Sequence, residues 1–136
     1  MKVFHGRAEG KVSEQRSSTF TGIVWGDPIM PTTDNVTINS VFFSPGARTY
    51  WHTHELGQIL QVTAGRGWIC ADGQPAQAIR QGDVVWIPPN ERHWHGAAAD
   101  TYMIHVATSL GKSNWQEEVS EHDYIGATAA AARETP

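Results

Sequence analysis

Cysteine is almost absent from this sequence, as are long apolar runs and any excess of positive charge. The one cysteine among the 136 residues, Cys70, excludes an internal disulfide and a zinc site built from several thiolates. No apolar run approaches the roughly 18 residues that would span a bilayer, so no membrane partner is expected. The chain has 10 Lys and Arg against 14 Asp and Glu, a net charge of -4. Nucleic-acid binding usually needs a basic face, so no nucleic-acid partner is expected.

The sequence also lacks a signal-peptide core and, before residue 115, any helical periodicity. We therefore expect a cytoplasmic protein with one domain over 1–136, an N-terminal arm over 1–18 and a flexible tail over 126–136, in which the alanine-rich stretch is either frayed or weakly helical. Eight or more short strands, separated by Gly, Pro and Asp turns, predict an all-β domain. We favour a jelly-roll β-barrel over a sandwich because a barrel places residues of distant strands around one interior.

The strand pattern can be followed along the chain. Residues 29–34 and 64–67 indicate a loop and a turn, and Asp72-Gly73 is a hairpin signal. Residues 115–119 suit either a last strand or the start of a short helix, followed by a terminal turn over 120–124. Strands are expected over 19–25, 36–43, 48–54, 58–63, 68–71, 76–80, 84–87, 93–95 and 102–108.

Histidine and tryptophan, in contrast, are abundant, with seven and six residues. A lone buried histidine more often bonds a backbone carbonyl than a metal, but this chain has two His-x-His pairs. Residues two apart on a strand share a face, with Cα atoms roughly 6.5 Å apart. Both rings can then reach one metal at about 2.0–2.2 Å. The two His-x-His pairs therefore predict a metal site. Five histidines lie in apolar or aromatic contexts rather than in polar loops: His52, His54, His93, His95 and His105.

The spacing around these pairs resembles that of the cupin family. Cupins carry a first motif, G-x5-H-x-H-x3,4-E-x6-G, and a second, G-x5-P-x-G-x2-H-x3-N. The first motif keeps every spacing, with glutamine in the glutamate position, and aligns with Gly46, His52, His54, Gln58 and Gly65. The second is looser, with asparagine in place of glycine and alanine in place of asparagine, and aligns with Gly82, Pro88, Asn90, His93 and Ala97.

The resemblance implies a cupin β-barrel that binds one divalent metal through His52, His54, Gln58 and His93. A glutamine amide is neutral, so the ion would keep its full charge, bind less tightly and act as a stronger Lewis acid. In the alternative interpretation, Gln58 lies outside the ligand set or the site is a relic. Three nitrogens and one oxygen suit manganese, iron, cobalt, nickel or zinc.

A closer resemblance is to the small manganese cupins with (R)-selective hydroxynitrile lyase activity, which share this ligand set. It implies manganese, and cleavage of a cyanohydrin to an aldehyde and hydrogen cyanide. His95, on the same strand face as His93, is then the first candidate base. His105 is a second acid or base, or a group that holds a ligand or water. Phe42, Trp94 and Met103 would shape an apolar pocket for an aromatic aldehyde, although core packing is the commoner use of such residues.

The sequence is also compatible with three other functions: a small cupin dioxygenase using iron or manganese, a uronate- or sugar-modifying cupin, and a non-catalytic sensor. A sugar site needs several polar or cationic side chains in the barrel, and the strands offer mainly aromatics, with the positions of Arg48 and Arg80 unresolved. A sensor normally carries a signalling or DNA-binding domain. We also expect a homodimer or higher homo-oligomer, with edge strands covered by a partner.

Overall fold

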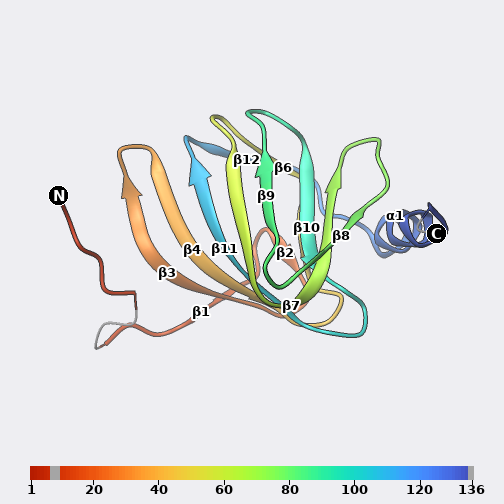
Figure 1. Ribbon diagram of the computed structural model, residues 1–136, viewed down its shortest axis with the longest axis horizontal. Coiled ribbons are helices and arrows are strands. Elements are labelled where there is room, and N and C mark those ends of the chain that lie inside the picture. The colour runs from red at the N-terminus through yellow and green to blue at the C-terminus, as the bar shows by residue number, and fades with distance from the viewer. Residues whose placement is uncertain (7–9, 135–136) are drawn as a thin grey trace.

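The computed structural model describes residues 1–6 and 10–134, which form a β-barrel with a helix on one side (Figure 1). Apolar side chains from both walls meet inside it, among them Val24 and Phe43 from one wall and Ile69 and Ile79 from the other. The elements are β1 (Glu14–Arg16), β2 (Phe20–Thr21), β3 (Val24–Thr33), β4 (Val36–Phe43), β5 (Arg48–Thr49), β6 (His52–His54), β7 (Gln58–Ala71), β8 (Gln77–Arg80), β9 (Val84–Ile87), β10 (His93–Ala97), β11 (Met103–Leu110), β12 (Ser113–Trp115) and α1 (Glu121–Glu134).

Two antiparallel sheets make the walls of the barrel. The first runs β1-β3-β4-β11-β7-β9, and uses the first half of β7. The second runs β2-β5-β10-β7-β8 and uses the second half of β7. In this sheet β6 also pairs with β10, and β12 pairs with β6. The expected all-β jelly-roll barrel is confirmed.

Strand β7 corrects the prediction of a turn over 64–67. The strand is continuous and bends from one sheet into the other at two glycines. A Cβ on Gly65 would lie 2.0 Å from the carbonyl oxygen of Tyr102, and one on Gly67 would lie 2.1 Å from that of Gly96. Glycine at these positions therefore permits close packing of neighbouring strands at the corner of the barrel, rather than a chain reversal.

The N-terminal arm connects the two sheets. Strand β1 pairs with β3 of the first sheet, and β2 pairs with β5 of the second. Residues 17–19 therefore cross from one wall of the barrel to the other. The loop predicted over 29–34 is also corrected: β3 continues to Thr33, and the hairpin turn is made by Asp34 and Asn35 with positive φ.

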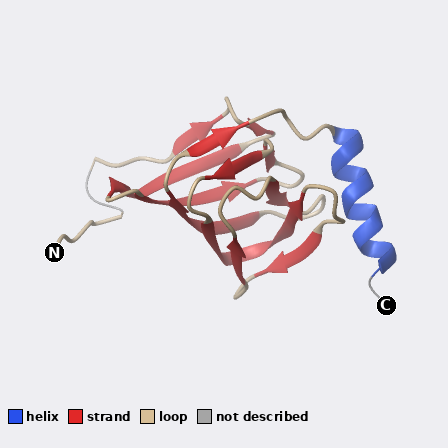
Figure 2. Cartoon of the chain, turned by 90° about the horizontal axis from the view of Figure 1, so that it is seen from above, coloured by secondary structure: helices blue, strands red, loops and turns tan. Residues whose placement is uncertain are grey.

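Helix α1 replaces the expected terminal turn and continues through most of the tail, so that of the two alternatives for the tail the helical one holds as far as Glu134. It lies on the outer side of the second sheet (Figure 2). Tyr124 is buried with Trp94 and Val119 in a second apolar cluster outside the barrel. Because the helix is fixed by these contacts, its weak amphipathic pattern gave little sign of it. Within the described residues, no helix is both long and apolar enough to cross a membrane.

Candidate metal centre

Three strands bring five histidines together inside the barrel. His52 and His54 come from β6, His93 and His95 from β10, and His105 from β11. In the register of the sheet His52 lies directly opposite His93, and their ring centroids are 4.2 Å apart. All five side chains are buried. The strand alternation that the sequence predicted thus directs both His-x-His pairs towards one interior point.

Three of these histidines present ligand atoms to one another at close range. One nitrogen each from His52, His93 and His95 lies within 4.8 Å of the other two. His54 lies beside them, with its ring centroid 4.9 Å from that of His52 and 5.5 Å from that of His93. The close trio therefore contains two of the three predicted histidine ligands, His52 and His93, together with His95, and the third predicted ligand, His54, lies beside it.

Backbone carbonyls fix the rings of His52 and His93. Nδ1–H of His52 donates to the carbonyl oxygen of Tyr50, and Nδ1–H of His93 donates to that of Glu91, both at 2.8 Å. A neutral imidazole protonated at Nδ1 carries its lone pair on Nε2. Both Nε2 lone pairs therefore face the cluster, which is the orientation that metal-binding histidines usually receive from such partners.

Two serine hydroxyls hold the remaining predicted ligands. Nδ1 of His54 lies 2.9 Å from Oγ of Ser113, and the amide nitrogen of Gln58 donates to Oγ of Ser109 at 3.0 Å. In this orientation Oε1 of Gln58 lies 3.3 Å from Nε2 of His93. Both atoms are acceptors, so their lone pairs repel unless a cation lies between them. This contact fits a metal site.

Burial lowers the pKa of every histidine in the cluster. Loss of solvation is the largest cause throughout, and it brings the pKa of His54, His93 and His105 to about 4. The pKa values of His52 and His95 also lie well below the usual 6.5, with neighbouring histidines adding to the effect. The rings are therefore neutral near pH 7, with lone pairs free to bind a metal or accept a proton.

His95 and His105 form a hydrogen-bonded pair. Nδ1 of His95 lies 3.0 Å from Nε2 of His105, and the backbone N–H of His95 donates to Oγ1 of Thr49. The outer nitrogens of the pair, Nε2 of His95 and Nδ1 of His105, are buried without a hydrogen-bond partner, as are Nε2 of His52 and of His54. Buried polar atoms are nearly always paired, so four unpartnered nitrogens at one place indicate that the site binds something.

A cavity of about 360 Å³ opens onto the histidines. One of its walls is aromatic: Phe20, Phe43 and Trp115 line it, and the indole of Trp115 stacks on His52 at 4.3 Å between ring centroids. Small polar side chains from β4 and β11 also line the cavity: Thr37, Asn39 and Ser109. Sequence reasoning missed these residues, although alternation along β4 and β11 places them on the inward face.

The structure places the apolar residues that the sequence suggested for the pocket elsewhere. Phe42 stacks on Tyr102 with ring centroids 5.9 Å apart, Trp94 packs against Tyr124 of α1, and Met103 is fully buried in the barrel core. Among the described residues that line the cavity, none of the three appears. Trp94 stands between two inward histidines on β10, so its side chain points to the outer face.

Comparison with known proteins gives a family and a relative that agree with a histidine-lined barrel. The model of a cupin domain matches residues 39–108. The chain is 49% identical over 111 residues to an (R)-mandelonitrile lyase from Granulicella tundricola, covering 77% of this chain and 85% of that protein. That relative is named for an enzyme, which indicates that this chain is an enzyme too.

Solved structures give the same fold. A cupin-like protein from Thermotoga maritima superposes with a TM-score of 0.82 at 41% identity, covering 89% of this chain and 97% of the other. The polyketide cyclase RemF from Streptomyces resistomycificus superposes with a TM-score of 0.70 at 19% identity, covering 92% and 91%. The second likeness bears on the fold alone. On its motif spacing, its histidine-lined barrel and these matches, the chain belongs to the cupin family.

Proposed function

We propose that this protein is a metal-dependent lyase that cleaves cyanohydrins to an aldehyde and hydrogen cyanide and catalyses the reverse addition. The observation that carries the proposal is the set of unpartnered, inward-facing histidine nitrogens at the end of an aromatic-walled cavity. The identity to a relative named (R)-mandelonitrile lyase supports the reaction type. The cavity wall of Phe20, Phe43 and Trp115 suits an aromatic aldehyde.

We assign the metal to His52, His54, Gln58 and His93, and manganese is the ion we propose. The fixed tautomers of His52 and His93, and the facing acceptors of His93 and Gln58, support this ligand set. Iron, nickel, cobalt and zinc suit the same donors. A bound divalent ion would supply Lewis acidity that lowers the pKa of a substrate hydroxyl.

His95 and His105 would move the protons. With Nδ1–H of His95 donating to Nε2 of His105, Nε2 of His95 is free to accept the hydroxyl proton of the cyanohydrin. The bond between the carbinol and nitrile carbons then breaks, and cyanide leaves with the electron pair. The Nδ1 proton of His95 passes to His105, and Nδ1–H of His105 protonates cyanide. Both rings start and finish neutral, in agreement with their lowered pKa values.

A mandelonitrile cleavage assay tests the proposal. Protein stripped with a chelator and reloaded with manganese should release benzaldehyde, and the stripped protein should not. Reloaded protein that releases no more benzaldehyde than a His52→Ala variant would contradict it. Oxygen consumption with candidate substrates would instead indicate the dioxygenase alternative.

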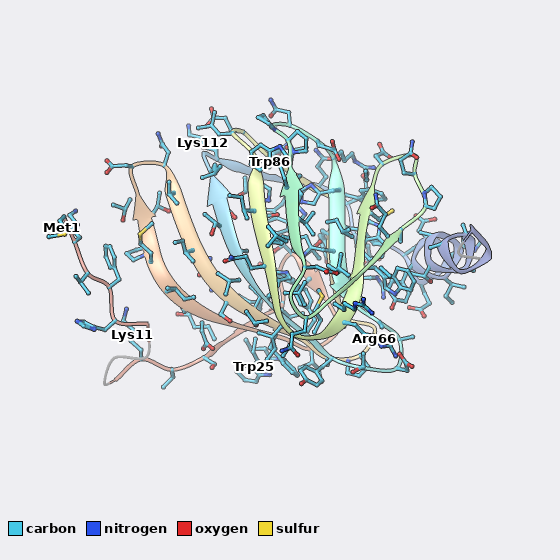
Figure 3. The ribbon with its side chains drawn as sticks, viewed as in Figure 1. Met1, Lys11, Trp25, Arg66, Trp86 and Lys112 are labelled. Atoms are coloured by element: carbon cyan, nitrogen blue, oxygen red, sulfur yellow. The ribbon has the colours of Figure 1, made fainter. Side chains whose placement is uncertain are left out.

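A second copy of the chain is the partner that we propose for the outer face of the first sheet. Two apolar rows cross that face: Trp25 pairs with Phe42, and Trp86 pairs with Ile59. Trp25 and Trp86 are 39% and 55% exposed (Figure 3). Exposed apolar rows of this kind often mark protein interfaces. Light scattering of a 15.0 kDa particle at micromolar concentration would contradict a dimer.

A further inference from the structure

The cavity extends from the histidines to the N-terminal arm, where Arg16 is among the residues that line it. Among the described residues that line it, Arg16 alone carries a full charge, and none is Asp or Glu. The chain as a whole is acidic, with a net charge of -4. The cavity therefore differs in charge from the rest of the molecule.

The position of Arg16 follows from the pairing of β1 with β3. Arg16 lies opposite Val24 and Glu14 lies opposite Gly26, so these four residues share the inward face of the sheet. The guanidinium lies over Gly26: a Cβ there would be 2.5 Å from Nε and 3.0 Å from Cζ of Arg16. The absence of a side chain at Gly26 thus makes room for the guanidinium against the barrel wall.

The sheet register also gives the backbone separation between the strand under this group and His105, one of the two proposed proton carriers. Gly26 pairs with Val41 on β4, and Val41 pairs with His105 on β11. Two strand spacings, roughly 10 Å, therefore separate the backbone under the guanidinium from that of His105. Val41 lies between them and lines the cavity. A para-substituted aromatic molecule can bridge such a distance.

Arg16 keeps hydrogen-bonding capacity for a ligand. Its ion pair is with Glu14 at 3.4 Å, and the Glu14 side chain is 58% exposed, against 34% for Arg16. An exposed pair of this kind contributes little energy. A guanidinium has five N–H donors and binds a carboxylate through two of them. Glu14 would therefore compete with an anionic ligand only weakly.

We propose that Arg16 forms an anion subsite at the mouth of the cavity, so that the physiological substrate carries a carboxylate on the side remote from its reacting carbon. The reacting end of this assignment rests on the proposed lyase function. The substrate class is then a carboxylate-bearing aromatic cyanohydrin or aldehyde, rather than a neutral one.

Binding of two matched probes tests this. Titration calorimetry on the metal-loaded protein compares 4-(hydroxymethyl)benzoate with its neutral amide, 4-(hydroxymethyl)benzamide. We expect the carboxylate to bind about five- to tenfold more tightly at low salt, the scale of a partly exposed charge-assisted hydrogen bond. The preference should disappear in Arg16→Gln. It should persist in Arg66→Gln, a matched charge removal at an exposed arginine that pairs with Asp100 outside the cavity (Figure 3).

Two further variants change the subsite without removing Arg16. Gly26→Ala should displace the guanidinium and reduce the preference for the carboxylate, because the new methyl group takes its place. Glu14→Gln should increase the preference because it removes the competing carboxylate. Equal binding of both probes to the wild type, or a preference that survives Arg16→Gln, would overturn the proposal, and so would a lower preference in Glu14→Gln.

The two proposals can fail separately. Wild-type protein that cleaves mandelonitrile and binds both probes equally would overturn the anion subsite and leave the lyase intact. Protein that prefers the carboxylate probe and cleaves no cyanohydrin would overturn the lyase and leave the subsite intact.

Discussion

Polar side chains are buried both between α1 and the second sheet and inside the barrel, but the first group is hydrogen-bonded and part of the second is not. Outside the second sheet, the buried guanidinium of Arg48 donates to the carbonyl oxygens of Val119 and Gly46 and lies 4.8 Å from the ring centroid of Tyr124. Tyr124 in turn donates its hydroxyl to Ala97. Inside the barrel, by contrast, four histidine nitrogens have no partner.

This difference in hydrogen bonding indicates which buried polar groups stabilise the fold and which bind a ligand. A buried polar group with its hydrogen bonds made holds the fold together, and here it fixes α1 to the barrel. A buried polar group without a partner lowers stability, because its solvation is lost and nothing replaces it. A cluster of such groups persists because a ligand completes it. Variants in the helix region should therefore change stability, and variants in the histidine cluster should change binding and turnover.

Acid should give the largest effect, chiefly through the histidine cluster. The pKa of His54, His93 and His105 is about 4 in the folded protein, below the usual 6.5. Between these values the unfolded chain binds more protons than the folded one, so stability falls as pH drops. We expect the metal-free protein to lose several kcal/mol from pH 7 to pH 4 in urea unfolding. Unfolding midpoints that stay constant over this range would contradict the account.

Removal of Arg48 should give the next largest effect, this time on stability. Arg48→Ala leaves the buried carbonyl oxygen of Val119 and the partly buried one of Gly46 without their donor, and removes the contact with Tyr124. We expect a loss of about 2–4 kcal/mol in the free energy of unfolding, with normal metal content in the folded protein. Arg80→Ala, at an exposed arginine, should change stability by less than about 0.5 kcal/mol. Equal effects of the two substitutions would remove the contrast between the regions.

His95→Ala should lower turnover with little change in stability. If His95 takes the substrate proton, mandelonitrile turnover should fall roughly 10²-fold while metal content stays close to that of the wild type. Metal analysis and steady-state kinetics on the same preparation measure both. Near-full turnover with metal bound would contradict this role for His95, and the general base would then be His105 or a metal-bound hydroxide.

Ser109→Ala should have a smaller effect, on metal affinity. Without the hydroxyl, the amide of Gln58 loses the partner that directs Oε1 towards His93. We expect about tenfold weaker metal binding in chelator competition, at the low end of the range for residues that orient ligands. Ser109→Thr should restore affinity, and Thr108→Ala, outward-facing on the same strand, should leave it unchanged. Weakening by Thr108→Ala to the same extent would indicate a general disturbance of β11.

The barrel and its histidine cluster could be predicted because both depend on strand alternation. The His-x-His pairs share a face whatever the rest of the fold does, and motif spacing brings β6 and β10 together. The same rule shows that Trp94 must face away from its histidine neighbours. Phe42 was ambiguous, since it stands within an apolar run whose inward positions cannot be chosen without the register.

Other features depend on contacts between distant segments and could not be predicted. Arg16 reaches the cavity because β1 pairs with β3, which no local pattern in the arm indicates. Gly65 and Gly67 resemble a turn in the local sequence. In the structure they lie within the bent strand β7, where the missing side chains let neighbouring strands approach closely. Helix α1 forms because Tyr124 packs on the barrel, whereas the alanine-rich sequence beyond it carries no periodic apolar face.

Metal binding to wild-type and His52→Ala protein tests the central claim most directly. After loading with manganese and removal of excess metal, elemental analysis of the wild type should give one ion per chain. Its urea unfolding midpoint at pH 7 should rise, because the ion binds the folded state and not the unfolded one. His52→Ala should lose the ion, this stabilisation and lyase activity together. A wild-type protein that retains no metal, or a His52→Ala variant that retains a full equivalent, would contradict the account.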